Sequence, residues 1–280
     1  MGKLMDYCKP EIDACHSVLI EVMTILGEFR DSLVIVGGNV PRLLIPDAKS
    51  KHPGTLDIDL ALDPRRIPRQ AYRTITETLI RAGYRAGSQP YIFYRDLLDE
   101  SGRTITVQLD LLAGEYGGTG KSHRTQRVQD ANPRKARGCD LAFDRPVTVT
   151  IEGELPEGGR NTVKVKVAAI GPFLVMKGMA LWSRKNEKDA FDIYYCCRNY
   201  PGGVKTLAGA VSPILGSGLA LEGLGKIRAK FGAIDMIGPV WVVKFSELED
   251  RDARERLQRE AFELVKNLLD QLGIEAFFEN

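Results

Sequence analysis

The chain has 280 residues, of which 44% are hydrophobic and 27% are charged. These values are ordinary for a folded globular protein and exclude a disordered chain. The formal net charge of only +2 excludes a globally basic protein, so any affinity for nucleic acid has to come from local clusters of Lys and Arg.

Targeting and redox signals are weak. No apolar run approaches the length that a membrane-spanning helix needs, and the first residues, MGKLMDYCKPEID, lack the apolar core of a signal peptide. The five cysteines show no C-x-x-C spacing and include the adjacent pair Cys196 and Cys197. This usage is typical of reduced thiols rather than of a disulfide framework or a zinc site. The sequence therefore predicts a cytoplasmic protein with no membrane partner.

The first predicted elements are a helix over residues 10–30 and a short buried strand over residues 33–36. Gly37 and Gly38 follow the strand, and Asn39 opens a short helix. Two glycines let the backbone come close to an anion, and the helix N-terminus directs free N–H groups toward it. This turn is therefore a candidate phosphate-binding site.

A D-x-D strand, TLDIDLALD over residues 55–63, comes next. Asp57 and Asp59 share one strand face and apolar residues share the other. Adjacent carboxylates repel each other unless a cation lies between them, and oxygen ligands without nearby His or Cys favour Mg²⁺. Alone, a D-x-D on a solvated strand is common, and a glycine pair is usually only a turn. Their ordered pairing is more specific, because nucleotidyl transfer requires a phosphate site followed by a carboxylate pair.

This ordered pairing resembles the polymerase-beta-like nucleotidyltransferase superfamily. Its signature is a small-residue pair at a helix start, usually Gly-Ser, followed by a strand with D-x-D. Here Gly38 replaces the serine, which removes a hydroxyl donor to the triphosphate. The resemblance implies an α/β (α+β) fold, with a mixed sheet and flanking helices, followed by a mostly helical C-terminal domain. The nucleotide-binding residues expected around the turn are Gly37, Gly38, Asn39, Arg42 and Thr55.

A helix over residues 65–85 is predicted next, with Ile75, Leu79 and Ile80 on its inner face. It is rich in arginine, which favours a solvated outer face over an RNA contact. Two strands follow, PYIFYRDLL and RTITVQLDLLAGE, and an Asp-Glu-Ser-Gly turn separates them.

Asp110 lies on the polar face of the second of these strands, together with Thr106 and Gln108. If this strand neighbours the D-x-D strand, three carboxylates converge. In the superfamily, the third position completes the metal site and can accept the proton of the attacking hydroxyl. Two metal ions would then clamp the attacking and leaving oxygens. The alternative is an exposed strand aspartate.

Residues 114–138 have the composition of a loop, and the GTGKS within it is not a P-loop, because Glu115 stands where that motif needs glycine. Between residues 121 and 137, six basic side chains stand against one acidic side chain. Solvated charge and a clamp for a phosphate backbone both fit such a run. The predicted RNA contacts are Arg124, Arg127, Arg134 and Lys135. Alternating runs at residues 147–151 and 163–167 then predict a hairpin that extends the sheet.

Residues 172–200, PFLVMKGMALWSRKNEKDAFDIYYCCRNY, predict two consecutive helices. Lys177 and Arg184 lie close to one face of the first helix. Asp189 is placed to act as N-cap of the second helix. Asp192 is surrounded by apolar residues and needs a charged partner, for which Lys177 or Arg184 is the natural candidate.

The pattern K-G-x-A-L-x-x-R followed by K-D-x-x-D-I-Y resembles the AbiEii-type abortive-infection nucleotidyltransferases, the toxin half of bacterial toxin–antitoxin pairs. The resemblance covers roughly residues 33–200. Family members transfer a nucleotide from NTP to an acceptor, and several modify the 3′ end of tRNA. The resemblance implies Mg²⁺ as cofactor, NTP as substrate, tRNA or another RNA as acceptor, and an antitoxin as a partner protein.

The same resemblance assigns roles to individual residues. Lys177 contacts phosphate, with Arg184 as a further nucleotide-binding residue, and Asp192 is the catalytic carboxylate of the helical domain. The third metal ligand is the least regular in such sequences. The implied metal ligands are Asp57, Asp59 and Asp110, and the implied catalytic residues are Asp57, Asp59, Asp110, Lys177 and Asp192.

The remainder of the chain begins with a Gly-rich stretch after Thr206, which we interpret as helical turns and loops. Residues 248–272 predict an amphipathic helix. Its expected inner face is Leu257, Ala261, Leu264, Leu268 and Leu272.

The predicted domains are a nucleotidyltransferase domain over residues 1–168 and a helical domain over residues 169–280, with Mg²⁺–NTP in the cleft between them. One alternative function is nucleotide transfer to a protein side chain or a small molecule. Another is a non-catalytic nucleotide- or RNA-binding module. The intact carboxylates count against the second, because a binding protein gains nothing from uncompensated negative charge.

Overall fold

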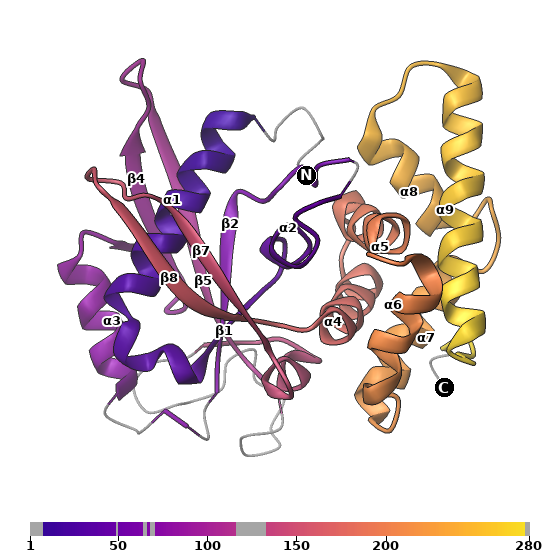
Figure 1. Ribbon diagram of the computed structural model, residues 1–280, viewed down its shortest axis with the longest axis horizontal. Helices are drawn as coiled ribbons and strands as arrows, with labels where there is room; N and C mark the ends of the chain where they lie inside the picture. The colour runs from indigo at the N-terminus through magenta and orange to yellow at the C-terminus, as the bar shows by residue number, and fades with distance from the viewer. Residues whose placement is uncertain (1–7, 49, 64–65, 68–70, 116–132, 278–280) are drawn as a thin grey trace. The chain divides into compact units, whose positions relative to one another are not determined.

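The computed structural model describes residues 8–48, 50–63, 66–67, 71–115 and 133–277 (Figure 1). Contacts among these residues divide into two compact units. Residues 8–40 and 54–169 form the first, here called the sheet unit, and residues 41–53 and 170–277 form the second, the helical unit. The predicted α/β class, with a mixed sheet, flanking helices and a mostly helical C-terminal part, is confirmed.

The described part of the sheet unit contains a mixed sheet in the order β3–β4–β5–β2–β1–β8–β7, with β6 paired to β5 off this path. The D-x-D strand β2 is central: it is antiparallel to β1 and parallel to β5. The strands are β1 (Leu33–Val36), β2 (Asp57–Leu62), β3 (Arg85–Ala86), β4 (Ile92–Leu98), β5 (Thr104–Ala113), β6 (Arg134–Lys135), β7 (Val147–Glu154) and β8 (Arg160–Val167).

The predicted alternation of β5 is confirmed. Ile105, Val107 and Leu109 are buried, while Thr106 is exposed and Gln108 is half-buried. The predicted hairpin is also confirmed, because β7 and β8 pair antiparallel and β8 joins the sheet beside β1. The loop prediction for residues 114–138 needs one correction, since β6 pairs parallel with the end of β5. A strand of two residues is too short to leave a periodic pattern in the sequence.

Helices flank the sheet: α1 (Lys9–Ile25) lies across it and contacts β5, β7 and β8, and α3 (Ala71–Arg81) contacts α1 (Figure 1). Two 3₁₀ helices, η2 (Gly27–Ser32) and η3 (Cys139–Phe143), complete the described helices of this unit. The described helix α3 is shorter than the predicted helix.

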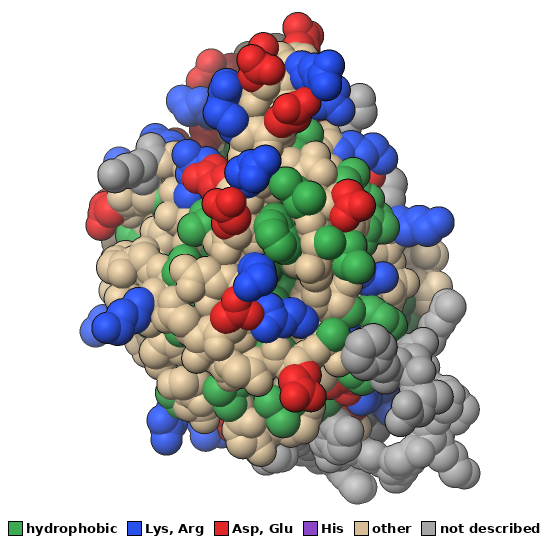
Figure 2. Space-filling model, turned by 90° about the vertical axis from the view of Figure 1, so that its right-hand side faces the viewer, with side chains coloured by type: hydrophobic (Ala, Val, Ile, Leu, Met, Phe, Trp, Pro, Cys, Tyr) green, Lys and Arg blue, Asp and Glu red, His purple; other side chains and the backbone are tan. Residues whose placement is uncertain are grey.

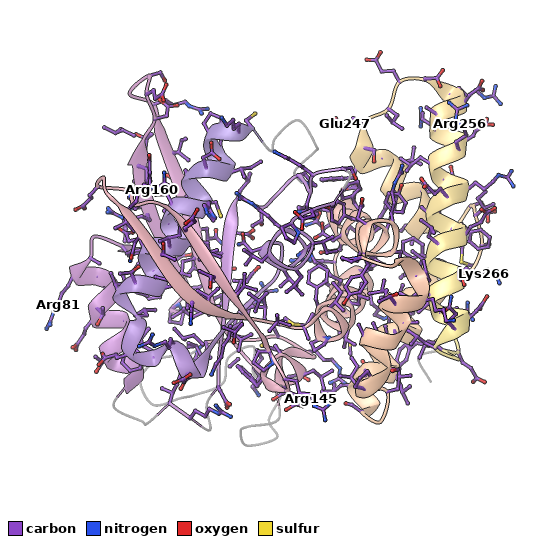
Figure 3. The ribbon with its side chains drawn as sticks, in the orientation of Figure 1. Arg81, Arg145, Arg160, Glu247, Arg256 and Lys266 are labelled. Atoms are coloured by element: carbon purple, nitrogen blue, oxygen red, sulfur yellow. The ribbon has the colours of Figure 1, made fainter. Side chains whose placement is uncertain are left out.

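The predicted inner face of α3 is correct for Ile75 and Leu79, which are fully buried, but wrong for Ile80, which is 46% exposed. The first two residues are four apart and share a face, whereas Ile80 is five positions from Ile75 and turns away. At the end of this helix, Arg81 points outward (Figure 3), as a solvated arginine-rich face requires.

The helical unit contains α4 (Ile170–Ser183), α5 (Glu187–Asn199), α6 (Gly203–Val211), η4 (Ser212–Ile214), α7 (Gly218–Lys230), α8 (Ile237–Ser246) and α9 (Arg251–Gln271). The short helix α2 (Asn39–Leu44) begins directly after the glycine turn. The predicted amphipathic helix is α9, whose buried residues are Ala261, Val265, Leu268 and Leu269. Leu257, Leu264 and Leu272 are only half-buried, so its inner face is rotated from the predicted one.

The side of the molecule drawn in Figure 2 carries a group of apolar side chains that charged side chains interrupt and border. Helix α8 contributes exposed apolar residues to the surface of the helical unit, among them Ile237 and Val240. Of the helices in the described ranges, none combines the length and apolar character needed to cross a membrane.

Candidate functional site

The glycine turn, Gly37 and Gly38, directly follows strand β1. Gly37 has a φ of +68°, in the left-handed region that favours glycine. A Cβ atom at this position would lie 1.8 Å from Oδ2 of Asp59, so any larger side chain would displace the Asp59 carboxylate. The turn predicted to bind phosphate therefore lies directly against one of the predicted metal ligands.

The side chain of Asn39 ties this turn to the start of β2. Asn39 is 4% exposed, and its Nδ2 donates a hydrogen bond to the main-chain carbonyl of Asp57 at 3.2 Å. The thiol of Cys15 on α1 donates to the same carbonyl at 3.6 Å. The Asn39 amide, predicted to bind nucleotide, thus holds the backbone at the first aspartate. Arg42, the next predicted contact, lies half-buried on α2.

The strand order brings the three predicted carboxylates to neighbouring positions. Strands β2 and β5 are parallel, and their register sets Asp59 opposite Asp110. Asp57 and Asp59 alternate with buried residues on β2 and are themselves half-buried. Asp110 is 7% exposed. The condition for convergence, that the two strands are neighbours, is therefore met.

Hydrogen bonds from residues two positions earlier orient two of the carboxylates. The hydroxyl of Thr55 donates to Oδ1 of Asp57. The amide Nε2 of Gln108 donates to Oδ1 of Asp110 at 2.9 Å. Thr55, predicted to bind nucleotide, is 5% exposed, and its hydroxyl is engaged with the Asp57 carboxylate. Gln108, expected from the sequence only to share the polar strand face with Asp110, thus orients this carboxylate.

The donor chemistry of this strand face suits Mg²⁺, because all its ligands are carboxylate oxygens. Within the part of the chain that the structure describes, no three or more His, Cys, Asp or Glu side chains are grouped closely enough to hold a metal ion. Mg²⁺ at Asp57, Asp59 and Asp110 stays a prediction.

In the helical unit, Lys177 on α4 lies between two carboxylates of α5. Its Nζ is 2.8 Å from Oδ1 of Asp189 and 2.7 Å from Oδ2 of Asp192. Both aspartate side chains are 0% exposed. The predicted pairing of Asp192 with Lys177 is confirmed, whereas Arg184 pairs with Asp189, at 2.8 Å from its Nε to Oδ2.

The prediction that Asp189 caps α5 is wrong. Asn186 is the N-cap, and its side chain accepts a hydrogen bond from the backbone N–H of Lys188 at 3.1 Å. Asp189 lies within the first turn, where its carboxylate faces Lys177 and Arg184. Burial works to raise the pKa of Asp189, but these two cations hold it below its ordinary value.

Two further residues reach Asp192 that the sequence analysis missed. Nε2 of His52 lies 3.0 Å from its Oδ1, and Nζ of Lys188 lies 3.0 Å from Oδ1 and 3.1 Å from Oδ2. The spacing of Lys188 and Asp192, four residues apart on one helix, could have indicated that pair. The pair with His52 left no local pattern, because it spans 140 positions.

Burial and charge set the protonation of this cluster. Burial lowers the pKa of His52 to about 4, although the hydrogen bond to Asp192 works in the opposite direction. Burial also works to raise the pKa of Asp192, but the ammonium groups of Lys177 and Lys188 hold it well below its ordinary value. At neutral pH the imidazole is therefore neutral and the carboxylate is ionised.

Only half of the predicted RNA contacts lie in the described part of the chain. Arg134 and Lys135 form β6, where the first is exposed and the second is half-buried. Arg124 and Arg127 lie outside the described residues. A nearby cation of the same basic segment, Arg137, pairs with Glu115 at 2.7 Å.

No family model and no curated protein matches this chain. Among solved structures, JHP933 from Helicobacter pylori aligns over 95% of this chain and 94% of its own, with 12% identity and a TM-score of 0.47. An antigenic nucleotidyltransferase-like protein from Paracoccidioides brasiliensis aligns over 96% of this chain and 95% of its own, with 16% identity and a TM-score of 0.41. TM-scores below 0.5 carry no argument about function, so any assignment depends on the residues of this chain.

Proposed function

We propose that the protein is a Mg²⁺-dependent nucleotidyltransferase that moves an NMP from NTP to an acceptor hydroxyl and releases pyrophosphate. The observation that carries the proposal is the register of Asp59 opposite Asp110 on two parallel strands. A glycine turn lies against the first of these carboxylates. Phosphate site and acidic strand face are therefore adjacent within the sheet unit.

In this proposal Asp57, Asp59 and Asp110 bind Mg²⁺ through their carboxylate oxygens. The metal would neutralise charge on the triphosphate and polarise the phosphoryl group. Gly37 leaves room for Asp59, and the hydrogen bonds from Thr55 and Gln108 fix the rotation of the other two carboxylates. Catalysis would consist mainly of positioning and charge neutralisation.

The finer assignment is a toxin that modifies the tRNA 3′ end and has an antitoxin partner. It is supported by the resemblance of the motifs around Lys177 and Asp192, and by the basic residues at 121–137. On the same grounds, Lys177 and Arg184 are proposed phosphate contacts. The rival acceptors are a protein side chain and a small molecule.

The test is transfer of label from each α-phosphate-labelled NTP to total cellular RNA, with Mg²⁺ and with a chelator. We expect metal-dependent labelling of RNA that Asp57→Asn and Asp59→Asn each abolish. Both variants should keep a thermal transition near that of the wild type, since a repulsion between like charges is relieved. Asp13→Asn, at an exposed residue of α1, is the matched control and should keep full activity.

Full activity in either D-x-D variant would overturn the metal assignment. Label on protein or on a small molecule, with none on RNA, would support the nucleotidyltransferase assignment but show that the acceptor is not RNA. Absence of metal-dependent transfer to any acceptor would overturn the proposed activity and favour a non-catalytic nucleotide- or RNA-binding module.

A further inference from the structure

The carboxylate of Asp192 has no acceptor position left in this structure. An ionised carboxylate offers about four lone-pair positions. Oδ1 of Asp192 is contacted by His52 and Lys188, and Oδ2 by Lys177 and Lys188. The side chain is 0% exposed. A carboxylate in this state cannot ligate a metal ion or take up a proton from a substrate before it loses one of these partners.

The cations around it are held just as firmly. Lys177 lies between the carboxylates of Asp189 and Asp192. Arg184 contacts Asp189 through Nε at 2.8 Å and Nη2 at 2.9 Å. Lys177 and Lys188 side chains are 9% and 7% exposed. Both ammonium groups contact Asp192, and this carboxylate offsets the repulsion between them.

The imidazole of His52 is fixed by more than its hydrogen bond. Its ring meets the ring of Tyr195 edge to face, with centroids 4.7 Å apart, and lies 6.4 Å from the ring of Phe191. The hydroxyl of Tyr195 donates to the carbonyl of Ser50, which holds the segment that carries His52. Because an ionised carboxylate only accepts hydrogen bonds, Nε2 is the protonated ring nitrogen and donates a hydrogen bond to Oδ1 of Asp192.

The charges of the cluster do not cancel. Lys177, Arg184 and Lys188 supply three positive charges, Asp189 and Asp192 supply two negative charges, and His52 is neutral at pH 7. One positive charge remains, which suits attraction of an anion rather than binding of a metal cation.

We propose that Asp192 is a positioning residue that holds the Lys177 ammonium, and that His52 is a second positioning residue that fixes Asp192. This inference rests on the proposed function in one respect: it takes Lys177 as a phosphate contact of the transferase. It departs from the role that the AbiEii resemblance gives to Asp192, because the saturated carboxylate performs no proton transfer and binds no metal.

The first test compares three variants by NTP-dependent transfer. His52→Phe keeps a ring against Tyr195 and removes the donor, whereas His52→Gln keeps an amide donor near the position of Nε2. We expect kcat to fall roughly 10-fold to 100-fold in His52→Phe, as it does when the hydrogen-bonding partner that orients a metal ligand is removed. His52→Gln should recover most of this loss. His16→Phe is the matched control, because His16 lies on α1 in the sheet unit, where its Nε2 is 3.0 Å from the main-chain carbonyl of Glu152. This change should not alter kcat.

The second test separates positioning from proton transfer. For a positioning role, Asp192→Asn lowers kcat by a similar factor at every pH, and the double variant with His52→Phe is no slower than Asp192→Asn alone. Loss of one limb of the kcat–pH profile in Asp192→Asn would overturn the proposal, because it would identify Asp192 as the acid or base. Additive losses in the double variant would likewise overturn it.

The third test does not depend on activity, so it stands even if the proposed function fails. A buried, paired ammonium exchanges its protons slowly, and we expect a resolved ¹⁵N-ammonium NMR signal for Lys177, assigned by its loss in Lys177→Arg. The signal should broaden or shift in His52→Phe and stay unchanged in His16→Phe. An unchanged signal in a folded His52→Phe protein would show that the imidazole does not position the ammonium.

Discussion

At the residue scale, Gly37 combines a backbone requirement with a steric one. Its φ of +68° disfavours other residues, and its missing side chain leaves the space that the Asp59 carboxylate occupies. A glycine in this family of turns is usually explained by the phosphate that approaches it. Here the same residue also determines where a predicted metal ligand lies.

Gly37→Ala should therefore do more damage than left-handed strain alone, which costs about 1–3 kcal/mol. Gly102 is the matched control, because its φ is +79° and nothing lies within 4 Å of a Cβ built there. We expect Gly37→Ala to lower the free energy of unfolding more than Gly102→Ala does, and to weaken Mg²⁺ binding. Denaturant unfolding and metal titration measure the two effects. Equal losses of stability with unchanged metal affinity would contradict the steric argument.

His52 makes stability depend on pH. Its pKa is about 4 in the folded protein, against 6.5 as the ordinary value. Between these values the unfolded chain binds a proton that the folded chain does not. The free energy of unfolding that depends on neutral His52 is therefore fully present above pH 6.5, and it is lost as the pH falls from 6.5 to about 4. The loss attributable to this group is about 3 kcal/mol.

Denaturant unfolding at pH 7, 5 and 4 measures this loss as the difference between wild type and His52→Gln, with His16→Gln as control. The imidazole NMR signal should stay that of the neutral form down to about pH 4. An imidazole that titrates near its ordinary pKa of 6.5 would refute the prediction.

At the element scale, the Gly-rich stretch after Thr206, which we interpret from the sequence as helical turns and loops, is largely helical. Glycine within a helix costs roughly 0.5–1 kcal/mol relative to alanine. The compensation is close packing of α4 on α7. A Cβ at Gly178 would lie 2.0 Å from the carbonyl oxygen of Gly223, and one at Gly223 would lie 2.7 Å from that of Val175.

Gly178→Ala should consequently separate α4 from α7 and cost about 1–3 kcal/mol, as overpacking does. Gly209 on α6 offers the opposite case, because nothing lies within 4 Å of a Cβ built there. Gly209→Ala should stabilise the protein by roughly 0.5–1 kcal/mol. Thermal and denaturant unfolding of both variants give the comparison. A Gly178→Ala protein as stable as the wild type would show that the two helices can separate at no cost.

At the scale of the whole molecule, the charge is nearly balanced, and the strongest local excess lies in residues 121–137. A net charge of +2 cannot by itself attract RNA, so affinity would depend on this segment. The other arginine-rich surfaces are interrupted by acidic residues, as on α9, where Arg251 pairs with Glu255.

Replacing Arg124, Arg127, Arg134 and Lys135 with Ser should weaken RNA binding and flatten its salt dependence. Each lost phosphate contact on a single strand reduces the log–log slope by about 0.7, so four contacts would reduce it by about 2.8. The matched control replaces four exposed arginines of α9 with Ser: Arg251, Arg254, Arg256 and Arg259.

Binding measured over a range of salt concentrations distinguishes the two sets, and NTP binding should survive in both. If the slope is the same in both sets, and label appears on protein or a small molecule, the charges of the basic segment are solvated and bind no RNA.

The sequence by itself determined the elements whose patterns are local. Strands β1, β2 and β5 follow from short apolar runs and period-2 alternation, and the hairpin of β7 and β8 follows from two alternating runs around a turn. The glycine turn and the D-x-D residues were identified in the same way. The α/β class follows because these local signals alternate along the chain.

Only the tertiary structure decided which of these residues meet. Asp110 became a neighbour of Asp59 through the parallel pairing of β2 and β5, and strand order is not written in any local pattern. The buried contact between His52 and Asp192 depends on a segment that lies far from α5 in sequence. Likewise, the sequence does not show that the glycines of α4 and α7 allow close packing, because this role depends on the contact between the two helices. The periodicity of apolar residues shows which face of a helix or strand is buried. Which strands and helices contact one another depends instead on the packing free energy of the whole unit.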